Sequence, residues 1–174
     1  MTEQKEYYDS IALGYDELHS EEQLKKLELI GKEIANDAQL KDFINPSDKL
    51  LDVGCGTGIS TGFFKAKEKQ GIDPSSELIK IAIKHHPLIK FKVGQAEELS
   101  YKNQEFDVII SLTAIQNFTN ISKGLEEIKR VGKKFILTFL RRSQKRETIE
   151  KLIKEKFKVV KKIEEDKDII FFCE

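Results

Sequence analysis

The apolar residues of this chain follow one period before residue 45 and another after it. Upstream, they recur every three or four residues, which predicts an amphipathic helix from Ser20, where a capping box with Gln23 would begin it, to about Ala38. A shorter helix or folded-over segment is predicted over residues 7–16, and the Asn-Pro-Ser-Asp turn at 45–48 closes the helical region. The stripe by which the long helix packs is expected to contain Leu24, Leu27, Ile30 and Ile34.

Beyond residue 45, short apolar runs alternate with segments of helical period. This alternation predicts an α/β fold in which buried parallel strands are joined by right-handed helical crossovers. The last two runs, 158–163 and 169–173, are separated by only five residues, all charged, so they should form an antiparallel hairpin. The other strands are predicted at 49–53, 70–73, 89–93, 106–112 and 134–140, and the helices at 59–67, 75–84, 121–130 and 143–157, with a short turn near Glu97.

Length, charge and cysteine content narrow the class of protein. The 174 residues suit one domain, 1–174, without a linker or internal repeat. The formal net charge is zero, so the whole chain has no field that would attract a polyanion or an anionic membrane. The chain shows no secretory signal, and its apolar runs are far shorter than the roughly 20 residues of a membrane span. Cys55 and Cys173 form no CxxC pattern, and a reducing, cytoplasmic setting is expected.

A glycine-rich loop is the first feature of the sequence that indicates a ligand-binding site. Gly54, Gly56 and Gly58 follow a predicted strand that contains Asp52, and they precede a predicted helix. Glycines at such a turn let the chain bend sharply and let a ligand approach the backbone without a Cβ in the way. Amide groups at a helix N-terminus would favour a negative ligand group. By itself the loop is weak evidence, because plain turns also contain glycines.

An acidic residue at the end of the next strand indicates which kind of ligand the loop could bind. Asp73 lies about 20 residues beyond the first glycine, the offset at which dinucleotide-binding sheets place the ribose-binding carboxylate. A carboxylate that accepts from both ribose hydroxyls makes a charge-assisted bidentate contact. The alternative is a structural role for Asp73 in capping the helix near Ser75. Strand, loop and offset together predict a nucleoside-binding site.

Several segments together resemble the class I S-adenosylmethionine-dependent methyltransferase family over nearly the whole chain. Residues 52–58 (Asp-Val-Gly-Cys-Gly-Thr-Gly) resemble its first motif and 71–75 (Gly-Ile-Asp-Pro-Ser) its second. Residues 94–99 with 105–111 resemble its adenine-binding turn and following strand, and the closing hairpin is also similar. The resemblance implies a Rossmann-like, doubly wound, seven-stranded sheet, S-adenosylmethionine as cofactor, and N-terminal helices at 1–45 that cover the cofactor cleft.

The resemblance also implies roles for single residues. Gly54 and Gly56 would lie against the methionine part of the cofactor, Asp73 would hold the ribose, and Pro74 would pack beside the adenine. Gln95 stands where the family often has Asp, so its amide oxygen would accept from the adenine amino group without a charge. The full set of expected cofactor-binding residues is Asp52, Gly54, Cys55, Gly56, Gly58, Asp73, Pro74, Gln95, Ala96, Ser111, Leu112 and Tyr15, of which Tyr15 could equally be an aromatic staple for the first helices.

The acceptor side of the expected site lacks an evident base. Many relatives have histidines at the positions of Gln116 and Asn117, and neither amide can take a proton. The Asn-Pro-Pro-Tyr and Asp-Pro-Pro-Tyr motifs are also absent, which argues against planar amide or exocyclic base nitrogens as acceptors. His85 and His86 end a helix, where contact with the last carbonyls explains them better than a metal does. We assign no catalytic residue and expect no metal.

A basic segment follows the fifth predicted strand. Arg141 and Arg142, with Lys145 and Arg146 beyond them, leave that strand at the edge of the sheet where ligands bind in open α/β folds. They could contact an acidic or phosphorylated acceptor, RNA included, or form an ordinary solvated helix start. The methyl acceptor therefore stays open between RNA, protein and an acidic small molecule, and a protein partner is an option.

Two other functions compete with methyl transfer. A nicotinamide dehydrogenase shares a glycine loop and an acidic ribose partner, but its glycines are spaced differently and its second half is another parallel unit. A non-catalytic subunit that binds S-adenosylmethionine and activates a partner would explain the missing base.

Overall fold

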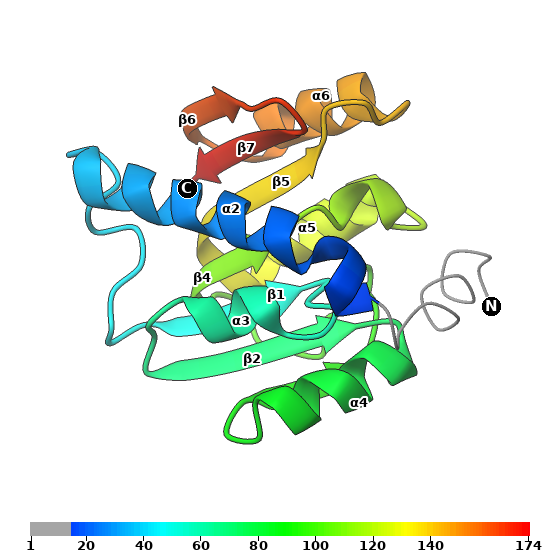
Figure 1. Cartoon of the computed structure of the whole chain (residues 1–174). Coiled ribbons are helices and arrows are strands. Elements are labelled where there is room, and N and C mark those ends of the chain that lie inside the picture. The colour runs from blue at the N-terminus through cyan, green and yellow to red at the C-terminus, as the bar shows by residue number, and fades with distance from the viewer. Residues whose placement is uncertain (1–14) are drawn as a thin grey trace.

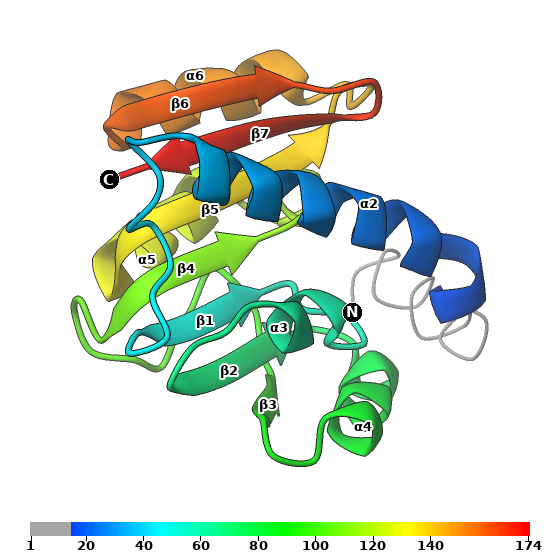
Figure 2. The same cartoon turned by 60° about the vertical axis from the view of Figure 1, so that its left-hand side comes forward.

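The computed structural model describes the chain from residue 15 to residue 174, and its side chains from residue 20. It contains one seven-stranded sheet in the order β3-β2-β1-β4-β5-β7-β6, drawn in Figures 1 and 2. β1 pairs in parallel with β2 and β4, whereas β7 runs antiparallel between β5 and β6. The predicted mostly parallel, doubly wound sheet with a C-terminal hairpin is confirmed. The strands are β1 (Lys49–Val53), β2 (Glu68–Asp73), β3 (Lys90–Val93), β4 (Phe106–Ser111), β5 (Gly132–Leu140), β6 (Val159–Glu164) and β7 (Asp168–Cys173).

Helices cover both faces of the sheet. Figures 1 and 2 show α2 and α3 on one face and α5 and α6 on the opposite face, while α4 packs beside β2 and β3. Their bounds are α2 (Tyr15–Asn36), α3 (Ile59–Phe63), α4 (Ser76–His85), α5 (Ile121–Val131) and α6 (Arg146–Lys156), with a 3-10 turn η2 (Ile115–Asn117) after β4. In the described residues, no helix is both long enough and apolar enough to cross a membrane.

The central strands are buried on both faces because each face has its own core. Side chains of β7 alternate strictly: Ile169, Phe171 and Cys173 pack with α5 and α6, whereas Ile170 and Phe172 pack with α2 and α3. This period of two within a continuous apolar run is typical of a strand with helices on both sides. It explains why the run at 169–173 is a strand although its sequence shows no polar alternation.

The predicted long helix is correct in kind and wrong in two details. α2 begins at Tyr15, so Ser20 lies inside the helix and does not form the predicted capping box. The predicted stripe holds at Leu27 and Ile30, but Leu24 is 44% exposed and Lys26 takes the buried position beside Leu27. Periodicity cannot predict this exchange, because only the tertiary structure supplies the partners that stabilise a buried ammonium. Of the predicted segment 7–16, residues 7–14 and the side chain of Tyr15 lie outside the described residues, and residues 15 and 16 are the first two of α2.

Two other helices are shorter than predicted, for local reasons. α3 ends at Phe63 because Phe64 takes an extended backbone conformation and turns its ring into the core shared with α2. α6 begins at Arg146, after a turn over residues 141–145, and not at 143. The predicted turn near Glu97 is present as a turn without a helix. These boundary errors leave the order and direction of the strands unchanged.

Candidate functional site

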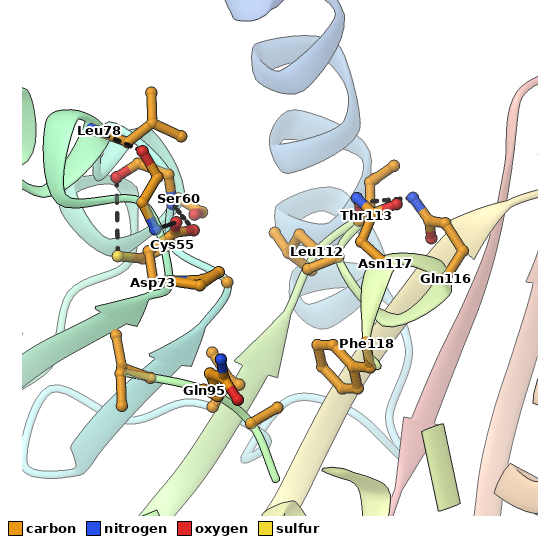
Figure 3. A pocket seen from close by; sticks show the side chains of 18 of the residues that line it. Cys55, Ser60, Asp73, Leu78, Gln95, Leu112, Thr113, Gln116, Asn117 and Phe118 are labelled. Atoms are coloured by element: carbon orange, nitrogen blue, oxygen red, sulfur yellow. Dashed lines mark hydrogen bonds between the residues drawn. The ribbon is translucent and has the colours of Figure 1, made fainter. Parts of the chain in front are cut away.

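One cavity of the described chain lies at the carboxyl ends of β1, β2 and β4, where the order of the strands reverses. Its volume is about 320 Å³, near the lower end of the roughly 300–1,000 Å³ found for small-molecule sites. The strand-end loops and one turn of α2 form its walls. Figure 3 shows Cys55, Ser60 and Asp73 on one side of the pocket and Thr113, Gln116 and Asn117 on the other. The cavity thus lies where open α/β sheets bind their ligands.

The glycine loop after β1 depends on a backbone that other residues adopt poorly. Gly54, Gly56 and Gly58 all have positive φ, at 80°, 54° and 85°. Space is also tight at Gly54, because a Cβ there would lie 2.3 Å from the Cβ of Ala114 in the segment after β4. The loop and the β4 end are therefore in direct contact, and the two sides of the cavity are fixed relative to each other.

The loop amides are already used within the chain. The amides of Gly54 and Cys55 donate to the carbonyl of Ile72 at 2.8 and 3.1 Å, and the amide of Gly58 donates to Cys55 at 2.9 Å. The amide of Gly56 donates to Asp73 Oδ2 at 2.9 Å. Each amide has a single proton to give, so these four amides are not free donors, and the expected binding of a negative group would fall to the amides at the start of α3. The glycines supply close approach instead of free donors.

Asp73 holds the loop and still faces the cavity. Besides the amide of Gly56 on Oδ2, its Oδ1 accepts from the amide of Ser75 at 2.9 Å. The side chain is 8% exposed and lines the cavity. An ionised carboxylate offers about four lone-pair sites, so these two amide contacts do not by themselves exclude contact with a vicinal diol. The two roles weighed for Asp73, local capping and ribose binding, are compatible.

Asp52 lies behind the loop, fully buried. Its Oδ2 accepts from Ser60 Oγ at 2.5 Å and from Thr61 Oγ1 at 2.7 Å, while Oδ1 has no hydrogen-bond partner. Desolvation raises the pKa of Asp52 to about 7, although the two hydroxyls oppose this. Near neutral pH this carboxyl is therefore balanced between its neutral and ionised forms.

The pH dependence of stability tests this assignment. An aspartate titrates near 3.9 in an unfolded chain, so between about pH 4 and pH 7 the folded state binds the extra proton at Asp52. Its contribution to stability is fully present below pH 4 and is lost as the pH rises towards 7, by on the order of 2–4 kcal/mol. We expect this slope in the unfolding free energy from urea titrations, and Asp52→Asn should remove it. Parallel curves for the two proteins would contradict it.

The opposite side of the cavity is built around Thr113. This residue has φ of 57°, an unusual conformation for a β-branched residue, and its amide donates to Thr138 Oγ1 at 2.8 Å. Gln116 Nε2 donates to the carbonyl of Thr113 at 2.7 Å. Lys26 of α2 donates to Thr113 Oγ1 and pairs with Asp168 of β7 at 2.7 Å. Side chains from four elements thus fix the backbone at the end of β4.

Comparison with known proteins agrees with this geometry. Residues 51–135, from β1 to the start of β5, match the family model described as a methyltransferase domain. The chain belongs to the class I S-adenosylmethionine-dependent methyltransferase family. A protein of Methanocaldococcus jannaschii, itself uncharacterized, is 36% identical over 160 residues, which cover 90% of this chain and 59% of that protein.

Two further relatives of the methyltransferase domain are informative. The demethylmenaquinone methyltransferase of Chlorobaculum parvum is 35% identical over 88 residues, which are 49% of this chain and 36% of that enzyme. A chain from the Haloferax volcanii complex with a methyltransferase activator superposes with a TM-score of 0.76 over 95% of this chain and 96% of its own length, at 16% identity. At that identity the likeness concerns the fold. Of the two curated relatives, the chain spans 59% of the Methanocaldococcus protein and 36% of the Chlorobaculum enzyme.

The methyltransferase domain brings together most of the residues singled out from the sequence. Ten of them line the cavity: Gly54, Cys55, Gly56, Asp73, Pro74, Gln95, Ala96, Leu112, Gln116 and Asn117. Asp52, Gly58 and Ser111 lie behind the wall, and Ser111 Oγ donates to the carbonyl of Val53 at 2.8 Å. Arg141 and Arg142 are exposed and do not line the cavity.

Several residues that line the cavity were not predicted from the sequence. Ser60 and Thr113 follow the expected motifs directly, so the continuation of each motif could have suggested them. Lys26 and its neighbours Glu22 and Gln23 come from α2, 26 or more residues before the glycine loop. Only the packing of α2 across the sheet brings them there.

No group of three or more His, Cys, Asp or Glu able to hold a metal occurs in the part of the chain that the structure describes.

Proposed function

We propose that this protein transfers the methyl group of S-adenosylmethionine to an acceptor that enters the cavity from the β4 side. The observation that carries the proposal is the position of Asp73, whose carboxylate lines the cavity at the end of β2, beside a glycine loop whose amides at residues 54, 55, 56 and 58 have partners within the chain. S-adenosylmethionine is a nucleoside without phosphates, so it requires the carboxylate and does not require the amides. Residues at the ends of β2 and β4, and Gln95 and Ala96 after β3, would hold the ribose, the methyl group and the adenine, respectively.

The same observation argues against a dinucleotide. A pyrophosphate on a glycine loop draws on several backbone donors, and here the loop amides of residues 54, 55, 56 and 58 all have partners within the chain, which leaves only the amides at the start of α3. We therefore expect micromolar binding of S-adenosylmethionine and S-adenosylhomocysteine in calorimetry, and none of NAD. Binding of NAD without any response to S-adenosylmethionine would overturn the proposal.

Methyl transfer from a sulfonium requires few chemical groups from the protein's side chains. The sulfonium of the cofactor activates the methyl group, so the protein has to align a nucleophile with the methyl carbon and exclude water. No histidine lines the cavity among the described residues. We infer that the acceptor atom is nucleophilic without a strong base.

The size of the cavity limits how the acceptor binds. A cavity of about 320 Å³ is close to the size expected for one ligand, so the cofactor fills most of it. The reacting group of the acceptor would then enter beside the cofactor, and the remainder of an RNA, a protein or an extended acidic molecule would lie outside the cavity. Transfer of tritiated methyl groups to separated small-molecule, RNA and protein fractions of the source cell would identify the class.

We also propose that a protein partner supplies part of the acceptor surface. Two observations support it: the small cavity, and the Haloferax neighbour, which was solved together with an activator. Methyl transfer that appears only when a cell extract fraction is added back to the purified chain would support a partner. Full activity of the purified chain on its acceptor would remove the need for one.

Arg141 and Arg142 are proposed to contact the body of the acceptor outside the cavity. Both are exposed at the end of β5, and the amide of Arg141 donates to Lys167 of the hairpin turn. Replacing both with Ala should leave cofactor affinity unchanged. For an anionic acceptor it should raise KM several-fold and flatten the salt dependence of the rate, because charge contacts are lost. Unchanged acceptor kinetics and salt response would make them ordinary surface residues.

A further inference from the structure

A buried ammonium lies on the acceptor side of the cavity, with its counter-ion behind it. Lys26 is 8% exposed, and it lines the cavity together with Thr113. Its partner Asp168 is 3% exposed and does not line the cavity. A ligand in the cavity therefore meets the cation of this pair. An ammonium has three protons, and among the described residues Asp168 and Thr113 take two of them.

A hydrogen-bond acceptor without a partner belongs to a side chain that contacts the same threonine. Gln116 is 9% exposed, and its Nε2 donates to the carbonyl of Thr113 at 2.7 Å. This contact fixes the amide, because the flipped orientation would place two oxygens against each other. Its Oε1 is buried and has no hydrogen-bond partner. A buried acceptor without a donor is costly, and a ligand that donates to it recovers that cost.

The strained backbone of Thr113 holds the two groups in place. Strain of this kind is retained where the surrounding contacts impose it, and it gathers at ligand sites. Here the contacts of Lys26 and Gln116 are among those that impose it. From the α6 side, Lys145 Nζ also donates to the carbonyl of Gln116 at 2.8 Å. A buried ion pair is poor evidence for added stability, which favours a role in recognition.

We propose that Lys26 and Gln116 form the acceptor subsite, and that the acceptor is the monoanion of a vicinal dihydroxy or enediol group. One oxygen is ionised and accepts the third proton contact of Lys26, and the neighbouring O–H donates to Oε1 of Gln116. This inference rests on the proposed methyl transfer. It names the class of acceptor and explains why the cavity needs no base.

The reaction balances without a proton acceptor in the protein. The acceptor loses its proton to solvent when it binds beside Lys26. Its oxyanion then attacks the methyl carbon, a C–O bond forms, and the C–S bond breaks with its electron pair going to sulfur. The products are a methyl ether and the neutral thioether of the cofactor.

The ionisation of a coloured probe tests the subsite without knowledge of the natural acceptor. Protein saturated with S-adenosylhomocysteine is titrated with 4-nitrocatechol, whose monoanion absorbs at longer wavelength than its neutral form. A cation in direct contact should move the ionisation midpoint of the bound probe down by about one pH unit or more. 4-Nitrophenol, which has no second hydroxyl, serves as the comparison and should show the same shift.

Substitutions at Lys26 and Gln116 measure the contribution of each group to binding of the probe. Lys26→Met combined with Asp168→Asn removes the cation without leaving a buried charge, and it should abolish the shift. Lys25→Met is the matched control, since Lys25 is the adjacent residue of α2 and its ammonium pairs with Glu21 on the exposed face; it should behave as the unmodified protein. Gln116→Leu should weaken 4-nitrocatechol about tenfold and leave 4-nitrophenol unchanged.

Calorimetry with S-adenosylhomocysteine on every sample separates this inference from the proposed function. Loss of that binding in the unmodified protein would contradict the proposed function itself. Retained binding with an unshifted probe, or a shift that persists in the Lys26→Met, Asp168→Asn protein, would overturn the acceptor subsite alone. If the double variant does not fold, the probe shift in the unmodified protein and the Gln116→Leu comparison still decide the matter.

Discussion

Replacing Gly54 with Ala is expected to reduce S-adenosylmethionine affinity by about 100-fold or more. The new Cβ would lie 2.3 Å from the Cβ of Ala114, and the φ of 80° at this position disfavours any side chain. Each of these effects costs about 1–3 kcal/mol of stability, and together they push apart two segments that line the cavity. A displacement of about 1 Å is enough to lose about two orders of magnitude in function. Calorimetry with the cofactor and urea unfolding measure the two consequences.

A second substitution separates the contact from the backbone strain. Ala114→Gly removes the methyl group that Gly54→Ala would meet, so the double variant should recover part of the affinity while the positive φ still costs stability. Ala114→Gly alone serves as the control and should bind the cofactor nearly as the unmodified protein does. Unchanged affinity in a folded Gly54→Ala protein would show that the cofactor does not depend on this loop.

Replacing Asp73 with Ala should weaken S-adenosylmethionine at least tenfold. The substitution removes a carboxylate proposed to accept from both ribose hydroxyls, a charge-assisted contact of about 1.5–3 kcal/mol. It also releases the amides of Gly56 and Ser75, which this carboxylate orders, so the loss should exceed that of the ribose contact alone. Calorimetry with S-adenosylhomocysteine should show a comparable decrease, since both ligands carry the same ribose.

A second cavity carboxylate provides the comparison. Glu97 also lines the cavity, but its Oε1 accepts from the amide of Asn120 at 2.9 Å and has no proposed ribose contact. Glu97→Ala should therefore change cofactor affinity much less than Asp73→Ala. Equal losses in the two variants would point to a general effect of negative charge, and an unaffected Asp73→Ala protein would mean that the ribose partner is another residue.

The sequence by itself determined the order and type of the elements and the cofactor side of the site. The apolar runs are long enough to fix seven strands, and the short spacer before residue 169 allows only a hairpin. Gly54, Asp73 and Gln95 were predictable because each lies at or just after the carboxyl end of a strand, and parallel strands bring such positions to one edge. A local rule sufficed wherever neighbours in the sequence are also neighbours in the site.

The proposed acceptor side depends on the tertiary structure. Lys26 comes from α2 and Asp168 from β7, and nothing local to either residue predicts that they meet. The same packing exposes Leu24 and buries Lys26, and only the folded chain supplies the carboxylate that stabilises an ammonium there. Whether the loop amides are free or occupied is likewise a tertiary question, since Ile72 and Asp73 reach them from β2. The physical reason is the same in each case. The spacing of apolar residues and the short sequence motifs depend on contacts between residues that are close in the sequence. The energy of a buried charge or of an amide without a partner depends on residues that only folding brings near.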